Sequence, residues 1–179
     1  MSRDSQLTPF SYTVLVLVGE GGAGPHDLVR MMRRGRVYWA ASESQWYAEP
    51  KRLERLGLLR SRKEPGRTRQ RTVYDLTDAG RAALREWAVT PVGFPRIQNE
   101  PIVRVLAADI VGDGRALEGL HGLRADLDAL DAELDSAEEV AAQLPHRERY
   151  LLLNHRLARR IVAAHREWLE EAERDLGEK

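Results

Sequence analysis

One stretch of this sequence constrains the fold most, because a helix signal there leads directly into a hairpin signal. The letters SESQ place Ser42 at a helix N-cap and Gln45 three residues later, the arrangement of a capping box. Gly57 stands where such a helix would end. Two short strand-like runs follow around Pro65-Gly66 and predict a β-hairpin with its turn at those two residues. The chain must therefore pack a helix beside a two-stranded ribbon.

Other helix signals surround this unit. The apolar run VLVLV could by itself be a buried strand, but Thr8 followed by Pro9 favours a helix that ends at Gly19. A second helix is predicted from Pro25 to Gly35, and a fourth begins at the cap Thr77 and runs to Pro91. Three helices, a ribbon and a further helix predict a mainly α fold, with a winged helix-turn-helix whose wing is a two-stranded β-hairpin. We assign residues 1–90 to this DNA-binding domain.

The second half has a different pattern. Residues 90–101 contain three prolines and are interpreted as a linker. A heptad pattern then runs from Leu120 to Ala141, and a last helix is expected from Arg147 to Leu176. Residues 91–179 are therefore predicted to be a C-terminal helical dimerisation domain, because two such helices have more apolar surface than one hairpin buries on itself. The predicted inward positions of the last helix are Leu153, Leu157, Ile161, Ala164, Trp168 and Ala172.

Charge separates the same two halves. The whole chain has 28 Lys/Arg and 28 Asp/Glu, but residues 1–90 have 16 against 10, which leaves 12 against 18 for the rest. A basic half beside an acidic half indicates a polyanion-binding unit joined to a partner-binding unit. There is no cysteine, no signal-peptide pattern and no apolar window near the roughly 18 residues of a bilayer span, so we expect a cytoplasmic protein without membrane contact.

Catalytic, cofactor and metal sites are not predicted. Gly19, Gly21 and Gly24 fit G-x-G-x-x-G, but the run before them is capped as a helix and no second parallel strand follows. The histidines lack a metal-ligand pattern, and the aspartates of residues 126–135 lie beside the leucine heptads, where a solvated face is expected. An enzyme that uses the glycine turn is the weakest of three hypotheses.

DNA contact is predicted for the third helix and the wing. Trp46, Pro50 and Leu53, with Leu56 or Gly57, fall on one face of that helix, and short polar or cationic residues fall on the other. Short side chains can approach base edges, while cations neutralise phosphates. The wing sequence RSRKEPGRTRQR adds a strongly basic ribbon that could lie on a phosphate backbone. The predicted DNA-contacting residues on these grounds are Ser42, Ser44, Gln45, Lys51, Arg55, Arg67, Arg69 and Arg71.

The sequence resembles the PadR family of bacterial transcriptional regulators. The resemblance is carried by LTPFSYTVLVLV, GPHDLVRMM, WYAEPKRLERLGLL and YDLTDAGRAAL. It implies a dimeric winged-helix repressor that binds a palindromic operator in double-stranded DNA, exchanges its C-terminal helices and responds to phenolic or planar aromatic ligands. Tyr47 matches a family residue that approaches a phosphate, and Lys51 and Arg52 match its cations. This chain departs from the family pattern in having Ala48-Glu49-Pro50 after the tyrosine.

Two further expectations follow. Trp87 and Trp168 are candidates for stacking on an aromatic effector, by analogy with the family. Pro50 lies on the apolar face of the third helix and is expected to kink it after Trp46, which would separate a reading turn from a supporting segment. The alternative function is a winged-helix module that binds another protein and no DNA.

Overall fold

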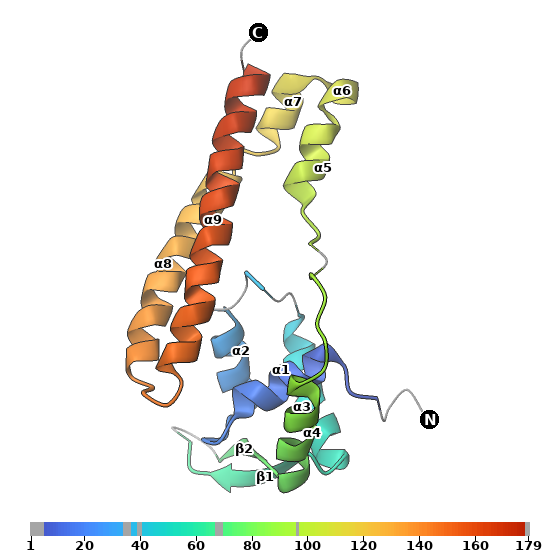
Figure 1. Ribbon diagram of the computed structural model, residues 1–179, viewed down its shortest axis with the longest axis vertical. Helices are drawn as coiled ribbons and strands as arrows, with labels where there is room; N and C mark the ends of the chain where they lie inside the picture. Colours follow the sequence, from blue (N-terminus) through green and yellow to red (C-terminus); the bar gives the residue numbers. More distant parts are fainter. Residues whose placement is uncertain (1–5, 34–36, 39–40, 67–69, 96, 178–179) are drawn as a thin grey trace. The chain divides into compact units, whose positions relative to one another are not determined.

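The fold is described from a computed structural model, which covers residues 6–33, 37–38, 41–66, 70–95 and 97–177. The chain divides into two compact units, Met1–Gly93 and Phe94–Lys179 (Figure 1). The predicted boundary lay between residues 90 and 91. Each unit is described separately.

The described residues of the first unit form four helices: α1 (Pro9–Val18), α2 (Pro25–Arg33), α3 (Glu43–Arg55) and α4 (Asp78–Ala88). The predicted caps begin three of them. Ser11 N–H donates to Thr8 Oγ1 at 3.2 Å and Gly80 N–H donates to Thr77 Oγ1 at 3.1 Å. At α3, Ser42 N–H donates to Gln45 Oε1 at 2.9 Å. The predicted end of the second helix at Gly35 lies outside the described residues.

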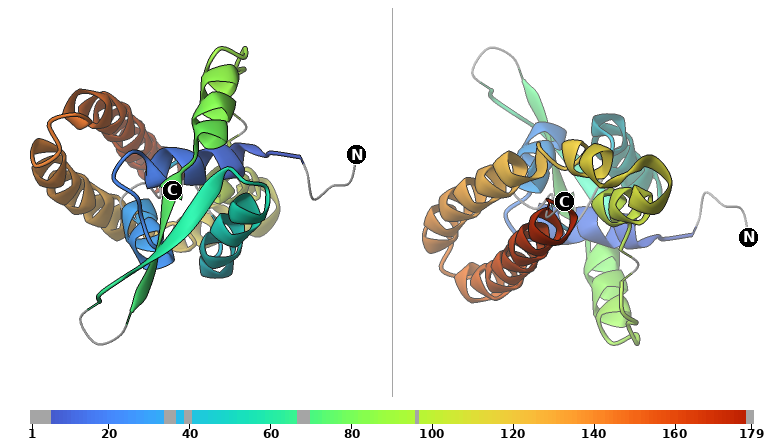
Figure 2. Two further views of the ribbon diagram at one scale, coloured as in Figure 1. Left: turned by 90° about the horizontal axis from the view of Figure 1, so that it is seen from below. Right: turned by 90° about the horizontal axis from the view of Figure 1, so that it is seen from above.

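The wing is an antiparallel hairpin of β1 (Leu59–Glu64) and β2 (Arg71–Leu76), with Leu59 opposite Leu76 and Glu64 opposite Arg71. The last pair is Glu64 with Arg71, so Pro65-Gly66 lies in the connection between the strands, where the turn was predicted. Residues 67–69 of this connection lie outside the described residues. An isolated bridge between Ala23 and Tyr74 gives β2 a second antiparallel partner beside β1. Figure 2 shows the hairpin extending beside α2.

The core of this unit is apolar and continuous. Leu15, Leu28 and Leu53 are completely buried, which joins α1, α2 and α3, and Leu59 and Leu76 bring in both strands. Trp46 lies edge-on to Phe10, with ring centroids 4.6 Å apart, and is 3% exposed. The core-packing interpretation of this tryptophan is therefore confirmed.

The apolar face predicted for α3 is largely buried. Trp46, Pro50 and Leu53 are buried as predicted, but Leu56 is 37% exposed. Pro50 lies inside one uninterrupted helix, so the predicted division into two segments is not seen. A bend of the helix axis at Pro50 stays a prediction.

In the second unit, the part of the chain that the structure describes forms three short helices and two long ones: α5 (Glu100–Leu106), α6 (Ala108–Val111), α7 (Asp113–Glu118), α8 (Leu123–Ala142) and α9 (Glu148–Gly177). Helices α8 and α9 pack against each other, and α7 packs against α9. Leu127, Leu134, Ala137 and Ala141 of the predicted heptad pattern are buried. No described helix is long and apolar enough to cross a membrane.

The predicted phase of α9 was wrong. Its buried positions are Ala158, Val162, Leu169 and Ala172, of which only the last was expected. The expected positions Leu153 and Leu157 are 59% and 52% exposed, respectively. The helix has a wide apolar arc, and α8 covers a different part of that arc from the one the heptad steps selected.

Candidate nucleic-acid interface

The outer face of α3 is polar, cationic and solvent-accessible. Ser44, Ala48, Lys51 and Arg55 are all exposed there, and Tyr47 is 41% exposed at its edge. Neither Lys51 nor Arg55 forms an ion pair with another described residue. The face combines short side chains in the first turns with cations further along, which suits approach to base edges and phosphates.

Arg52 does not join this face. Its guanidinium donates to Glu49 at 2.9 and 2.7 Å and to Ser11 Oγ at 2.8 Å, and its side chain is only 16% exposed. The prediction that Arg52 contacts DNA is therefore not supported by its placement. Glu49 is held by the same pair and its side chain is only 13% exposed, so its charge does not lie on the outer face.

The second acid of α3 is also used internally. Glu54 Oε1 accepts a hydrogen bond from the Ser61 backbone N–H at 3.1 Å, which ties the end of α3 to the start of the wing. Burial, and secondarily the charge of Glu54, raise the pKa of Tyr74. Both acids beyond the first turn of α3 thus face the protein, and this leaves the outer face without a carboxylate of its own in that region.

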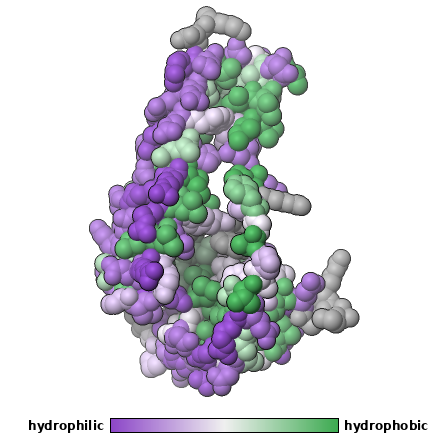
Figure 3. Space-filling view, in the orientation of Figure 1, coloured by the Kyte–Doolittle hydropathy of each residue, from purple (hydrophilic) through white to green (hydrophobic). Residues whose placement is uncertain are grey.

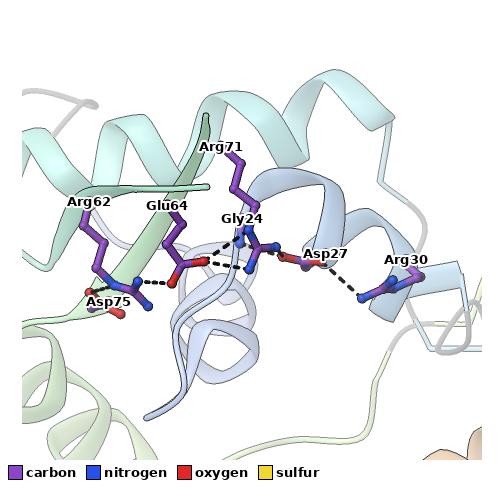
Figure 4. A network of polar contacts seen from close by, with 7 residues as sticks. All are labelled: Gly24, Asp27, Arg30, Arg62, Glu64, Arg71 and Asp75. Atoms are coloured by element: carbon purple, nitrogen blue, oxygen red, sulfur yellow. Dashed lines mark hydrogen bonds and ion pairs between the residues drawn. The ribbon is translucent and has the colours of Figure 1, made fainter. Parts of the chain in front are cut away.

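A chain of ion pairs holds the base of the wing (Figure 4). Arg62 donates to Asp75 at 2.8 Å and pairs with Glu64. Arg71 donates to Glu64 at 2.8 Å and to Asp27 at 3.0 Å. Asp27 in turn accepts from the Gly24 N–H at 3.1 Å, and Arg30 pairs with it as well. The two strands are thereby joined to the first turn of α2.

These contacts shift the acid–base behaviour of the wing. Hydrogen bonds from Arg62 and then Arg71 lower the pKa of Glu64. Hydrogen bonds to Asp75 and then Glu64 raise the pKa of Arg62, and the hydrogen bond to Glu64, followed by the charge of Asp27, raises the pKa of Arg71. Arg71 keeps about half its surface exposed (51%), so it can reach a phosphate only while also facing two acids. The predicted contacts Arg67 and Arg69 lie outside the described residues.

The glycine-rich turn is occupied by protein contacts. Ala23 and Tyr74 exchange two backbone hydrogen bonds, each 3.0 Å long. A Cβ on Gly24 would lie 2.8 Å from the Thr72 carbonyl oxygen, so glycine is required there for close approach to the wing. The turn therefore attaches β2 to the helices, which accounts for Gly24 without a bound pyrophosphate. The described residues contain no group of His, Cys, Asp or Glu that could hold a metal ion.

The two tryptophans predicted to bind an effector lie in different units. Trp87 stacks on Tyr12 with centroids 4.7 Å apart and planes 7° from parallel, and it remains 39% exposed. Trp168 is half-buried on α9. The structure does not test ligand binding by either residue.

The second unit has a large exposed apolar surface. Figure 3 shows apolar residues gathered over α5 and α6. Ile102, Val103, Leu106 and Ile110 are between 45% and 83% exposed on these two helices. Patches of this kind on soluble proteins mark interaction sites.

Comparison with known families gives one match to a family model. The model of the "Transcriptional regulator PadR-like family" matches residues 17–86, a span that begins near the end of α1 and ends in α4. No curated protein matches the sequence significantly.

Solved structures share the fold across nearly the whole chain. The regulator BC1756 from Bacillus cereus has a TM-score of 0.78 at 17% identity and covers 99% of both chains. PadR from Bacillus subtilis in complex with operator DNA has a TM-score of 0.74 at 20% identity, over 96% of this chain and 98% of its own. The virulence activator AphA from Vibrio cholerae has a TM-score of 0.71 at 24% identity, over 93% and 97%. At these identities the likeness establishes the fold alone.

Proposed function

Because the chain carries a PadR-like transcriptional-regulator domain over residues 17–86, we propose that it is a homodimeric repressor that binds a palindromic operator. Members of this family are regulators and not enzymes. The observation that carries the proposal is the outer face of α3, where the helix turns its acids inward and presents Ser44, Lys51 and Arg55 to solvent. The B. subtilis protein of the same fold was solved on its operator.

A salt titration tests DNA contact by this face. The probe is the DNA upstream of the protein's own coding sequence, and binding is measured by fluorescence anisotropy between 50 and 200 mM salt. Each phosphate contact contributes about 0.9 to the slope of log K against log salt. The double variant K51A/R55A should therefore lower the slope by about 1.8. Arg85→Ala removes an exposed cation of α4 and serves as the control, with an unchanged slope expected.

Two results would count against this proposal. Wild-type binding that does not weaken with salt would exclude phosphate contact. A slope that K51A/R55A leaves unchanged would place the contact elsewhere. A folded protein with no affinity for DNA would favour the protein-binding alternative.

Dimerisation is proposed through the apolar arc of α9 that α8 leaves open. Tyr150, Leu153 and Leu157 are 64%, 59% and 52% exposed along it. A two-fold dimer would bury these residues against their own copies, as closed symmetric interfaces do. In sedimentation, L153E/L157E should be monomeric, and Ala163→Glu, an exposed change on the polar side of α9, should remain dimeric. A dimeric double variant would refute this interface.

An aromatic effector is proposed at Trp87. One ring face stacks on Tyr12 and the residue keeps 39% exposure, which leaves room for a second planar ring. B. subtilis PadR, at 21% identity and a TM-score of 0.65 over 94% of this chain and 99% of its own, was also solved with p-coumaric acid. Titration with p-coumaric acid should quench tryptophan fluorescence and weaken DNA binding in the wild type but not in Trp87→Ala. Equal quenching in both would place the ligand elsewhere.

A further inference from the structure

A buried polar residue of α1 lies against Arg52, on the flank of α3 beside its outer face. Ser11 of α1 is a fully buried polar residue, at 0% exposure. Its hydroxyl forms a hydrogen bond with Thr8 Oγ1 and accepts a hydrogen bond from Arg52 at 2.8 Å. Glu49 receives two hydrogen bonds from the same guanidinium and is 13% exposed. Three polar groups from two helices thus form one compact cluster, which we call the α1–α3 latch (Ser11, Glu49 and Arg52).

The position of Arg52 on the helix gives it two directions. At 3.6 residues per turn, Arg52 lies about 60° from Glu49 on the inner flank and about 60° from Arg55 at the centre of the outer face. A side chain as long as arginine can reach either side from this position. Glu49 supplies the charge that draws Arg52 inward, and Ser11 supplies the acceptor that fixes it on α1.

We infer that Glu49 is a positioning residue that holds Arg52 out of the DNA groove and fixes the rotation of α3 against α1. The inference rests on the proposed DNA-binding function. In the wild type, Ser44, Lys51 and Arg55 contact the DNA, while Arg52 stabilises the packing of α3 on α1. Loss of the Glu49 carboxylate turns Arg52 outward, where it gains a phosphate of any sequence.

Salt dependence separates this latch from a merely structural ion pair. Glu49→Ala should steepen the slope of log K against log salt by about 0.9, because one further phosphate is contacted. Between 50 and 200 mM salt, that slope corresponds to an additional loss of affinity of about 3.5-fold. The gain in affinity at low salt should be equal for operator and random DNA, so the ratio between them should not improve.

Arg52→Ala is the decisive partner variant. In the latch it contacts no phosphate, so the wild-type slope should be unchanged when Arg52 is removed. In the double variant E49A/R52A the steepening should disappear. Glu43→Ala, which removes an exposed acid from the first turn of the same helix, controls for net charge and should leave the slope unchanged.

Two results would overturn the latch. A slope that falls by about 0.9 in Arg52→Ala would mean that Arg52 already contacts DNA, which overturns the latch. An unaltered slope in a folded Glu49→Ala protein would overturn it as well. If the wild type shows no salt-dependent DNA binding, the proposed function fails and the DNA role of the latch fails with it. In that case the fold role is still measured by a double-mutant cycle of Ser11→Ala and Arg52→Ala in thermal unfolding, where purely additive losses would reject it.

Discussion

Replacing Pro50 with alanine should make the first unit more stable while it weakens DNA binding. Proline in a helix interior is about 3 kcal/mol less favourable than alanine, because its ring clashes with the preceding turn and its backbone donates no hydrogen bond. Pro50 is the eighth residue of α3, which begins at Glu43. The substitution restores a donor for the carbonyl of Trp46.

The loss of packing opposes this gain. Pro50 is less than 2% exposed, between Trp46 and Leu53 on the buried face. Alanine removes roughly two buried methylene groups, worth about 1.6 kcal/mol in total. The net expectation is a gain of about 1 kcal/mol in the free energy of unfolding, or a melting temperature higher by roughly 4–8 °C for a unit of this size.

Urea unfolding of the full chain measures this change. A Trp168→Phe background leaves tryptophans only at positions 39, 46 and 87, all in the Met1–Gly93 unit, so fluorescence reports on that unit. A loss of 1 kcal/mol or more in P50A would show that ring packing outweighs helix strain and would refute the reasoning. If P50A is more stable but binds DNA as well as the wild type, a bend at Pro50 has no role in recognition.

Three other changes test different parts of the structure. Gly80→Ala should cost about 1–3 kcal/mol in the unfolding of the first unit, because a Cβ there would overlap the Leu58 carbonyl oxygen; thermal unfolding that matches the wild type would contradict this contact. Burial lowers the pKa of His155 below its unfolded value, so the unfolded state binds more protons and stability should fall as the pH drops below about 6.5. His155→Gln should remove that part of the pH dependence in melts followed by circular dichroism, and an identical pH profile would assign it to other groups. Glu64→Gln should remove the ion pairs of this carboxylate with Arg62 and Arg71. Because these contacts lower the pKa of Glu64, the stability they give is present above its unfolded pKa of about 4.3 and is lost as the pH falls below that value. The melting temperature of the variant should therefore fall less than that of the wild type below about pH 4.3, and parallel profiles would contradict this.

Local signals were enough to predict most helices of the first unit. Thr8, Ser42 and Thr77 each cap the helix that follows them, because a cap depends only on a side chain and backbone three residues away. The hairpin was predicted from alternation and turn residues. The length of its connection was not, because a two-residue turn at Pro65-Gly66 and a longer connection begin with the same residues.

A local signal was also missed in the second unit. The prolines near residue 100 suggested a linker, but Pro101 lies in the first turn of α5, after Asn99 in the capping position. Proline at the start of a helix carries no lost hydrogen bond. The sequence Asn-Glu-Pro therefore contained a helix start that composition alone obscured.

The phase of α9 could not be chosen from the sequence. Its apolar residues span roughly half the helix circumference, from Leu153 through Ile161 to Ala158. The heptad steps followed one edge of that arc, and α8 packs against the other. The position of α8 decides which edge of α9 is buried within one chain. The other edge stays exposed, and it is the surface proposed above for dimerisation.

The direction of charged side chains was the other quantity that spacing could not supply. Arg52 was grouped with Lys51 because both match cations of the family that the sequence resembles, yet its partner Ser11 lies 41 residues earlier in the chain. The wing shows the same effect, since Arg62 and Arg71 face acids that come from β1, β2 and α2. The excess of cations in residues 1–90 therefore overstates the charge available to DNA.

Where acids of the same unit hold the arginines, a phosphate must replace a carboxylate, and this exchange yields little net free energy. On α3 the acids are turned inward, and a phosphate meets Lys51 and Arg55 without such competition. The strength of the proposed interface thus depends on where the carboxylates lie as much as on the number of cations.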